Sequence, residues 1–507
     1  MPILSIIVFA PLLAAGVLMV LPASSRTAIR VTSIFAAAVS LALSCVALKH
    51  FMDGDPLRET LPMVPSLGIS YSLYADGWSS VLLLLTGIIL FAGCWASWTV
   101  EKRDREFYVL LLVLSTGVFG VFVCLDLFLL FLFYEIAVLP MYLLIGIWGS
   151  SKRIAPRGPL AFAMKKFDVG GREYAAMKLT LMLLGGSALI LVGILAMAGS
   201  APSHFNFNME DLARVHFPHA LQLWAFPFLW LGFGSLAGVW PFHTWSPDGH
   251  ASAPTAVSML HAGVLMKLGA FGVIRIGMVL LPEGAQAWAP VVGGIAALNV
   301  CYGALSAMAQ TDLKYVIAYS SVSHMGIVLL GAATMTVNGW NGAVFQMFAH
   351  GIMTGMFFAL VGLVYERSHS RDIPSMGGFA RAMPGIAVCF TLAGLSSLGL
   401  PGTAGFVAEF LVFLGAYESN HIFWMLPAVL GAFFTAVYVL RATRQIFWGP
   451  PGTGDFPHLS DARGPEWVAL ILLGSAIVLF GVWPKLALAA IDPTTMNFLP
   501  RLTGILH

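Results

Sequence analysis

Residues 254–280 read PTAVSMLHAGVLMKLGAFGVIRIGMVL, an apolar stretch with a lysine, Lys267, near its middle. A helix needs about 20 mostly apolar residues to cross the hydrocarbon core of a bilayer, so this stretch is long enough to span a membrane. A charge at the bilayer centre costs about 2.5–3.5 kcal/mol on insertion scales, and such residues normally face the interior of a helical bundle. The stretch therefore predicts one helix of a membrane protein that carries ionisable groups in its interior.

The rest of the chain has the same apolar character. Of its 507 residues, 59% are hydrophobic and 10% are charged, whereas soluble domains carry about 25% charged residues. The net charge is only +2 and no basic run is interleaved with aromatics, which argues against nucleic acid as a partner. Five cysteines lie singly in apolar stretches, so disulfides and metal sites are not expected. The first basic residue, Arg26, follows the first apolar stretch, so residues 2–22 are predicted as a retained membrane helix rather than a signal peptide.

Hydropathy predicts an all-α integral membrane protein with about 14 transmembrane helices. The predicted spans are residues 2–22, 28–48, 78–99, 107–123, 126–148, 176–199, 221–243, 254–280, 287–308, 313–333, 340–365, 383–417, 423–447 and 466–487. The seventh span runs into Pro241, Pro247 and Pro254, and the twelfth carries Gly394, Gly399, Pro401, Gly402 and Gly405. Both are therefore expected to be broken helices.

The two broken spans lie five helices apart, which predicts an internal repeat. Residues 107–280 (spans 4–8) and 287–447 (spans 9–13) are expected to be two copies of one five-helix unit, inverted because the number of helices is odd. Residues 1–106 would add three N-terminal helices and residues 466–507 the last helix and C-terminus, so that residues 1–507 form a single polytopic domain. Broken helices at matching positions of inverted repeats are typical of ion-coupled transporters.

Lysine and arginine are divided unequally between the two sides of the predicted spans. Loops 1–2, 3–4, 5–6, 9–10, 11–12 and 13–14 hold eighteen of these residues, and the side with both termini holds five. Positive residues are enriched on the cytoplasmic side of membrane proteins. Both termini are therefore expected on the non-cytoplasmic side of an energy-coupling membrane such as a bacterial inner membrane.

Five ionisable side chains lie inside different predicted spans: Glu135 in the fifth, Lys267 in the eighth, His324 in the tenth, His350 in the eleventh and Glu409 in the twelfth. Intramembrane acids and lysines mark ion paths and proton relays, and histidine can pass a proton because it titrates near neutral pH. We expect a relay in the order Glu135, Lys267, His324, His350, Glu409. Each acid can alternatively be an anchor to a neighbouring helix, and each histidine a satisfied core residue.

Three further groups lie in or near the spans. Lys178, at the start of the sixth span, is either interfacial or a functional partner for a buried acid. Arg275, near the end of the eighth span, is expected to be an anchor. His261 lies six residues from Lys267, about 240° away around a helix, and is expected to be structural.

Several motifs carry a resemblance that covers nearly the whole chain. They are YEIAVLPMY at 134–142, PFHTWSPDGH at 241–250, APTAVSMLHAGVLMK at 253–267, QTDLK at 310–314, AYSSVSHMG at 318–326 and GFVAEF at 405–410. On these motifs the chain resembles the antiporter-like subunits of respiratory complex I, most closely the M-type (mitochondrial subunit-four-like) subunit. Glu409 favours the M-type over the similar L-type subunit, which has a lysine at this position.

The resemblance implies a proton-translocating membrane-arm subunit of an NADH:quinone oxidoreductase. Glu135 would be the acid of the fifth helix that pairs with and modulates a lysine, and Lys267 would be the central-axis lysine. His324 and His350 would be connecting relay residues, and Glu409 would exchange protons with the outside.

The resemblance also implies what surrounds the chain. Its partners would be other membrane-arm subunits, including neighbouring antiporter-like subunits, together with lipid, and the transported ion would be the proton. No cofactor is expected in this chain, which has no GxGxxG, CxxC or haem-type motif. Flavin and iron–sulfur clusters would then reside on partner subunits.

One departure from the family pattern concerns the seventh helix. The family usually carries a lysine five residues before the Pro-Phe-His motif, and this position is Leu236 here, with no ionisable residue between 221 and 242. The usual pair with Glu135 cannot form, so Lys178 becomes the candidate partner of Glu135. Ser246, Gly249 and a longer 5–6 loop also depart from the pattern, as in a specialised or second M-type copy.

Two other functions fit the same residues. The chain can be a subunit of a cation/proton antiporter or of a membrane-bound hydrogenase, which share the polar motifs. It can also be a structural spacer of the membrane arm with a modified pump site, as Leu236 suggests. The sequence leaves the quinone, the electron donor and the choice between proton and sodium open.

Overall fold

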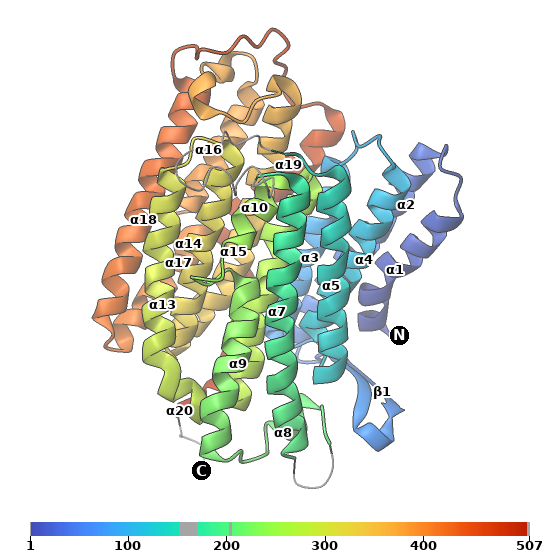
Figure 1. Cartoon of the computed structure of the whole chain (residues 1–507), viewed down its shortest axis with the longest axis vertical. Helices are drawn as coiled ribbons and strands as arrows, with labels where there is room; N and C mark the ends of the chain where they lie inside the picture. The colour runs from blue at the N-terminus through green and yellow to red at the C-terminus, as the bar shows by residue number, and fades with distance from the viewer. Residues whose placement is uncertain (1, 152–169, 202–204, 504–507) are drawn as a thin grey trace.

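The computed structural model describes residues 2–151, 170–201 and 205–503, nearly all of them in one bundle of roughly parallel helices (Figure 1). Thirteen helices within these ranges are long and apolar enough to cross a membrane. The twelfth predicted span is a pair of shorter helices, α16 (Pro384–Ser397) and α17 (Ala404–Glu418), and brings the described spans to the expected fourteen. Five basic residues of the predicted 5–6 loop (Lys152, Arg153, Arg157, Lys165 and Lys166) lie outside the described residues.

The spans follow one another along the chain, and Figure 1 shows α1 and α2 at one side of the bundle and α18 at the other. The unbroken spans other than the seventh and eighth are α1 (Ile3–Val20), α2 (Arg26–Met52), α3 (Gly77–Ala96), α4 (Asp104–Val123), α5 (Leu127–Trp148), α7 (Arg172–Gly199), α13 (Pro282–Met308), α14 (Leu313–Ala333), α15 (Val337–Ser368), α18 (Ile422–Thr443), continued by a π-helical turn Arg444–Trp448, and α19 (Gly464–Val482).

The seventh span is broken, as predicted, but at a glycine before the prolines. Helix α9 (His219–Ala237) ends at Gly238, whose φ of 80° is a left-handed conformation that glycine adopts without steric cost. Residues 239–244 run without regular helix, and the short helix α10 (Trp245–Ser252) follows. The span therefore has a non-helical segment, of which Val239 and His243 are buried and the other residues exposed, and its backbone groups are available to polar partners.

The eighth span contains two π-helical turns. It runs through α11 (Thr255–Leu260), the turn η2 (His261–Leu265), α12 (Met266–Gly272) and the turn η3 (Val273–Met278). A π turn loosens the i to i−4 bonding pattern and is frequent at functional sites. Residues 256–278 are all buried, as are residues 339–364 of α15, so these two helices form the centre of the bundle.

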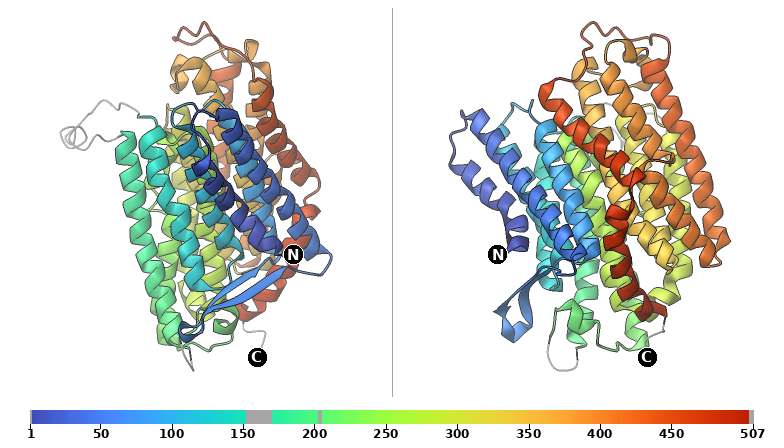
Figure 2. Two further views of the ribbon diagram at one scale, coloured as in Figure 1. Left: turned by 90° about the vertical axis from the view of Figure 1, so that its right-hand side faces the viewer. Right: turned by 180° about the vertical axis from the view of Figure 1, so that it is seen from behind.

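A β-hairpin, one short helix and one longer helix lie at one end of the molecule (Figures 1 and 2). Strands β1 (Arg58–Val64) and β2 (Ile69–Tyr74) pair antiparallel within the predicted 2–3 loop. Helix α8 (Met209–Leu212) lies at the same end, as does α20 (Lys485–Thr503), which continues past the last span. Asp126 ties the hairpin to the bundle, because its carboxylate accepts from the Ser70 amide at 2.9 Å and from two amides of α5.

Candidate functional site

Lys267 lies at the centre of the bundle with no solvent exposure. Its ammonium donates to the carbonyl oxygen of Ala262, which belongs to the π turn immediately before α12. The Lys267 Nζ also lies 2.7 Å from Nδ1 of His350 on α15. A charge buried this deeply requires polar partners, and the π turn and the histidine supply them.

The contact between Lys267 and His350 defines a direction for proton transfer. When Nζ carries three protons, Nδ1 of His350 is the acceptor and the imidazole carries its own proton on Nε2. Nε2 is buried and has no hydrogen-bond partner in the described part of the chain. The pair can therefore exchange one proton through Nδ1, while Nε2 is left without a partner among the described residues.

His324 of α14 lies beside His350, with ring centroids 5.2 Å apart. Its Nε2 lies 3.1 Å from the Ser397 hydroxyl, and its Nδ1 lies 3.2 Å from the Gln346 side-chain amide nitrogen. The same Nδ1 is 3.4 Å from Oε1 of Glu409. His324 thus lies between His350 and Glu409, and both of its ring nitrogens have partners that can hold or pass a proton.

Glu409 lies in the second turn of α17, immediately after the break in the twelfth span. It is only 5% exposed. Its Oε2 lies next to Gly399. A Cβ atom added to Gly399 would be only 2.7 Å from this oxygen. Gly399 has a φ of 72°, so the break needs glycine here both for the backbone conformation and for the space that the carboxylate occupies.

Four of the six predicted site residues are thus in one continuous set of contacts across four spans. The order differs from the predicted one: Lys267 contacts His350 directly, and His324 is the neighbour of Glu409. The sequence could not order the two histidines, because their order depends on how α14 and α15 are rotated about their axes.

The expected pair between Glu135 and Lys178 is not formed, which corrects the prediction. Nζ of Lys178 lies 2.8 Å from Oδ2 of Asp248 on α10. The carboxyl end of α5 meets the start of α7, where Arg172 donates to the Ile147 carbonyl. Glu135 lies 13 residues before the end of α5 and Lys178 lies six residues into α7, so at 1.5 Å per residue their backbones differ in depth by about 10 Å.

Glu135 itself is half-buried on the side of α5 that carries the exposed residues Leu132 and Leu139. It forms no ion pair with any residue that the structure describes. Leu236, which replaces the usual lysine of the seventh helix, is fully buried in α9. The Glu135 carboxylate is therefore separate from the contacts around Lys267 in this chain.

Sequence reasoning missed two polar residues at the first broken helix. Asp248 accepts from Lys178 and also from the Tyr315 hydroxyl at 2.9 Å. Lys314, buried at the start of α14, donates to the Ala253 carbonyl at 2.7 Å. Asp248 could have been found from the sequence, because it is an acid in the motif at 241–250, where the seventh membrane span is interrupted.

Two histidines connect this region with Lys267. His250 of α10 and His261 of the π turn have ring centroids 3.9 Å apart, and Nε2 of His250 lies 3.4 Å from the sulfur of Met266. Neither ring nitrogen of His261 has a hydrogen-bond partner among the described residues. His261, which was expected to be structural, is therefore a buried polar group whose ring nitrogens need water as a partner.

Arg275 behaves as the expected anchor. Its guanidinium lies 2.5 Å from the Asp76 carboxylate at the start of α3 and 4.4 Å from the ring centre of Phe498 in α20. Both members of the ion pair are nearly fully buried. Through these contacts Arg275 holds η3, the start of α3 and α20 together at one end of the bundle.

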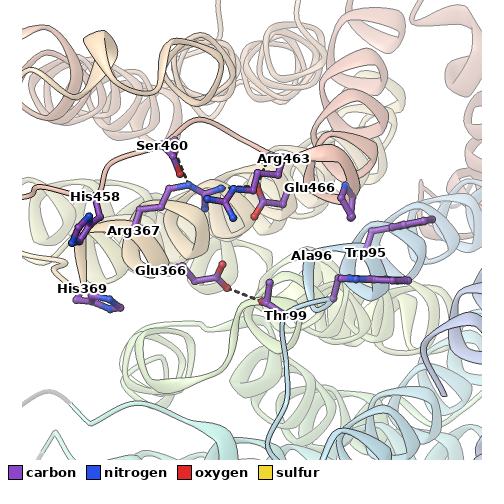
Figure 3. A pocket seen from close by; sticks show the side chains of 12 residues that line it. Trp95, Ala96, Thr99, Glu366, Arg367, His369, His458, Ser460, Arg463 and Glu466 are labelled. Atoms are coloured by element: carbon purple, nitrogen blue, oxygen red, sulfur yellow. Dashed lines mark hydrogen bonds and ion pairs between the residues drawn. The ribbon is translucent and has the colours of Figure 1, made fainter. Parts of the chain in front are cut away.

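A surface pocket of about 420 Å³ lies apart from these groups, where α3, α15 and α19 meet (Figure 3). Figure 3 shows Glu366 bonded to Thr99, and Arg367 directed towards Ser460 and Glu466. The residues that line this surface pocket include neither Lys267 nor Glu409. The pocket is therefore not an opening to the buried set.

The family model described as NADH:quinone oxidoreductase/Mrp antiporter, TM, matches residues 124–435. The chain belongs to this family. A relative called NAD(P)H-quinone oxidoreductase chain 4 1, from Synechococcus sp. (strain JA-2-3B'a(2-13)), is 37% identical, with 100% of this chain and 94% of the relative covered. The expected resemblance to antiporter-like subunits of complex I is confirmed.

Solved structures of this antiporter-like family share the whole fold. A chain in respiratory complex I from Thermus thermophilus with bound NADH matches with a TM-score of 0.87 and 28% identity, covering 99% of this chain and 100% of that one. A chain in the Mrp complex from Dietzia sp. DQ12-45-1b matches with a TM-score of 0.84 and 22% identity, covering 99% and 98%, which shows a shared fold. The predicted integral membrane fold is thus confirmed.

Proposed function

We propose that this chain is the M-type, proton-translocating membrane-arm subunit of an NAD(P)H:quinone oxidoreductase, and that protons move along Lys267, His350, His324 and Glu409. The observation that carries the proposal is the unbroken series of contacts from the centre of the eighth span to the break of the twelfth. The name of the cyanobacterial relatives and the match to a chain of complex I support the assignment to this enzyme.

The chemistry of the four groups favours protons over sodium. Sodium is a hard cation that needs several oxygen ligands, as calcium and magnesium do. Lys267, His350 and His324 offer nitrogen atoms instead, and only Glu409 offers a carboxylate. Nitrogen bases in contact pass protons readily, so the antiporter alternative with sodium as the moving ion is disfavoured along this path.

Proton transfer follows from the contacts. A proton on Lys267 passes to Nδ1 of His350, continues from the neighbouring imidazole of His324, and leaves through Nδ1 of His324 to the Glu409 carboxylate. Where the ring nitrogens do not touch, ordered water completes the path. Glu409, at the broken helix, then exchanges its proton with the non-cytoplasmic side.

Uptake begins at the first broken helix in this scheme. Lys178 and Asp248 form an ion pair about one-fifth exposed, and His250 and His261 lie between that pair and Lys267. Separation of Lys178 from Asp248 would change the local charge and so the proton affinity of the groups next to them. This pair takes the place of the usual pair between the fifth and seventh helices, which Leu236 prevents.

The remaining parts of the proposal concern orientation, repeats and partners. Both termini lie on the non-cytoplasmic side, which the unequal division of lysine and arginine supports. Residues 107–280 and 287–447 are the two inverted units, supported by the breaks at corresponding places. NADH oxidation and quinone reduction, with their flavin and iron–sulfur clusters, take place on partner subunits, and neighbouring antiporter-like subunits flank this chain.

The experiment compares Glu409→Gln with Glu418→Gln in the assembled complex. Glu418 lies at the exposed end of the same helix, where it accepts from Asn338 at 2.6 Å, so it controls for loss of a carboxyl group on α17. We expect Glu409→Gln to lower the number of protons translocated per electron pair, with quinone reduction in the presence of uncoupler unchanged. Equal ratios for the two variants would support the structural-spacer alternative and refute proton transfer through Glu409.

A further inference from the structure

Tyr438 of α18 is a buried hydroxyl beside the proton path that none of the steps above uses. It is 2% exposed, and its hydroxyl has no hydrogen-bond partner among the described residues. The hydroxyls of Ser320, Ser397 and Thr435 lie around it, with the Glu409 carboxylate nearby. A buried hydroxyl without a partner is destabilising, so this group of hydroxyls is a place for ordered water.

Tyr438 is connected to the proton path through Ser397. The Ser397 hydroxyl lies 3.1 Å from Nε2 of His324, and Nδ1 of the same ring lies 3.4 Å from Glu409. The neighbouring Ser396 hydroxyl is also buried without a partner in the described ranges. Ser397 is thus hydrogen-bonded to His324, and the Tyr438 hydroxyl, which has no direct partner among the described residues, needs a bridging water to reach it.

In the other direction, Tyr438 lines two cavities that lead to the surface. The first is a small, largely apolar cavity of about 10 Å³, which is the lower limit for one water molecule, and Ser320 and Tyr438 are the two residues with hydroxyl groups that border it. The second is a pocket of about 260 Å³ that contains Gln310 and Thr311. Both cavities also touch Val316 and Ala442, so they are adjacent.

The larger pocket opens on the side of the 9–10, 11–12 and 13–14 loops, which we assign to the cytoplasm. Thr311 and Arg441 at its mouth are exposed. The Arg441 guanidinium donates to the Met308 carbonyl and remains a positive group in the lining, beside the neutral polar side chains of Gln310, Thr311 and Gln445. The narrow part between Val316 and Ala442 is apolar, and an apolar constriction conducts only while it is wetted.

We propose that Tyr438 connects this pocket with His324 and forms a second proton entry, which loads Glu409 from the cytoplasmic side without passing Lys267. This inference rests on the proposed function. It assigns Tyr438 and Ser397 as relay residues and makes the second half of the subunit independent of the first, where Leu236 replaces the usual lysine.

Each step of this entry conserves protons. Water in the small cavity gives a proton to the hydroxyl chain, and the Tyr438 and Ser397 hydroxyls each accept one proton and release one. Nε2 of His324 accepts the proton from Ser397, and Nδ1 releases one to the Glu409 carboxylate, which becomes neutral. The imidazole then carries its proton on Nε2, and rotation of the ring, with reorientation of the hydroxyls, brings this proton back to the Glu409 side before the next transfer.

The first test is Tyr438→Phe in the assembled complex, which removes one oxygen atom and keeps the ring. Tyr108→Phe is the matched control, because the Tyr108 hydroxyl is also buried but donates to the Cys94 and Ser97 carbonyls in the N-terminal half. We expect Tyr438→Phe to translocate fewer protons per electron pair than Tyr108→Phe, with equal uncoupled quinone reduction. Equal ratios overturn the second entry.

The second test measures access from the cytoplasmic face and does not depend on Tyr438. In inside-out vesicles, Ala442→Cys should react with a membrane-impermeant, negatively charged thiosulfonate, and the modified complex should lose proton translocation relative to the unmodified one. The parent protein, with its five native cysteines, supplies the background. A thiol at 442 that does not react from this face, or whose modification leaves the ratio unchanged, overturns the proposal.

Glu409→Gln separates the failure of this inference from the failure of the proposed function. If Glu409→Gln lowers the ratio while Tyr438→Phe matches its control, the main path stands and the second entry is wrong. If neither variant lowers the ratio, the subunit does not move protons through Glu409, and both proposals fail.

Discussion

Replacement of Gly399 by alanine should displace the terminal acid of the proton path. The added Cβ would lie 2.7 Å from Oε2 of Glu409, whereas an ordinary contact between carbon and oxygen is about 3.3 Å or more. The carboxylate, as the end of a flexible side chain, would move by about 0.6 Å to reach that distance. The 3.4 Å separation between Oε1 of the same carboxylate and Nδ1 of His324 changes by at most about that amount, to about 4 Å at the upper limit, which is beyond the reach of a hydrogen bond.

The same substitution also strains the backbone, and Gly402 offers a control for that effect. Gly399 and Gly402 both have left-handed φ angles, 72° and 94°, which cost an alanine about 1–2 kcal/mol. A Cβ at Gly402 meets nothing within 4 Å. Gly402→Ala should therefore lose similar stability without moving Glu409.

The assay is proton translocation per electron pair in membrane vesicles, measured beside uncoupled quinone reduction and the melting temperature of the complex. Because a misplacement of about 1 Å in a reacting group can cost about 100-fold in rate, we expect Gly399→Ala to lower the ratio clearly and Gly402→Ala to leave it near that of the parent. If both variants pump equally well, the position of the Glu409 carboxylate over Gly399 does not matter for function.

Two further changes test the ion pairs at the ends of the spans. Lys178→Met and Asp248→Asn should each lower the proton ratio, and the double variant should do no more damage than either alone, because the two residues act as one pair; additive losses would contradict this. Asp76→Asn leaves Arg275 buried without its partner, which costs about 3–5 kcal/mol, so we expect less assembled complex on native gels but a normal proton ratio in the complex that does assemble. A lowered ratio with normal assembly would instead place Asp76 in the proton path.

Much of the fold was predictable because the bilayer imposes a simple rule on length and hydropathy. The expected spans agree with the described helices, and the breaks in the seventh and twelfth spans lie where proline and glycine interrupt apolar sequence. The exact end of α9 at Gly238 was not predicted, because the prolines that follow it were the stronger signal. The β-hairpin was missed, because its strands are short, β1 is largely exposed, and the hairpin depends on contacts of Glu59 and Asp126 with the bundle.

The members of the candidate site were easier to predict than their arrangement. A lysine or acid in an apolar span is conspicuous, which identified Lys267 and Glu409. Pairing depends on depth and on helix rotation, so the Glu135–Lys178 pair was predicted wrongly and the two histidines were placed in the wrong order. Tyr438 carried no signal, because a tyrosine in a membrane helix is ordinary until its hydroxyl is found buried without a partner.

Infrared difference spectroscopy of the assembled complex tests most directly whether Glu409 receives the proton. Upon quinone reduction, transfer from His324 should produce the carbonyl band of a protonated carboxyl group, and this band should be absent in Glu409→Gln and retained in Glu418→Gln. A band of equal intensity in all three proteins, or no carboxyl band in the parent during turnover, would contradict proton transfer to Glu409.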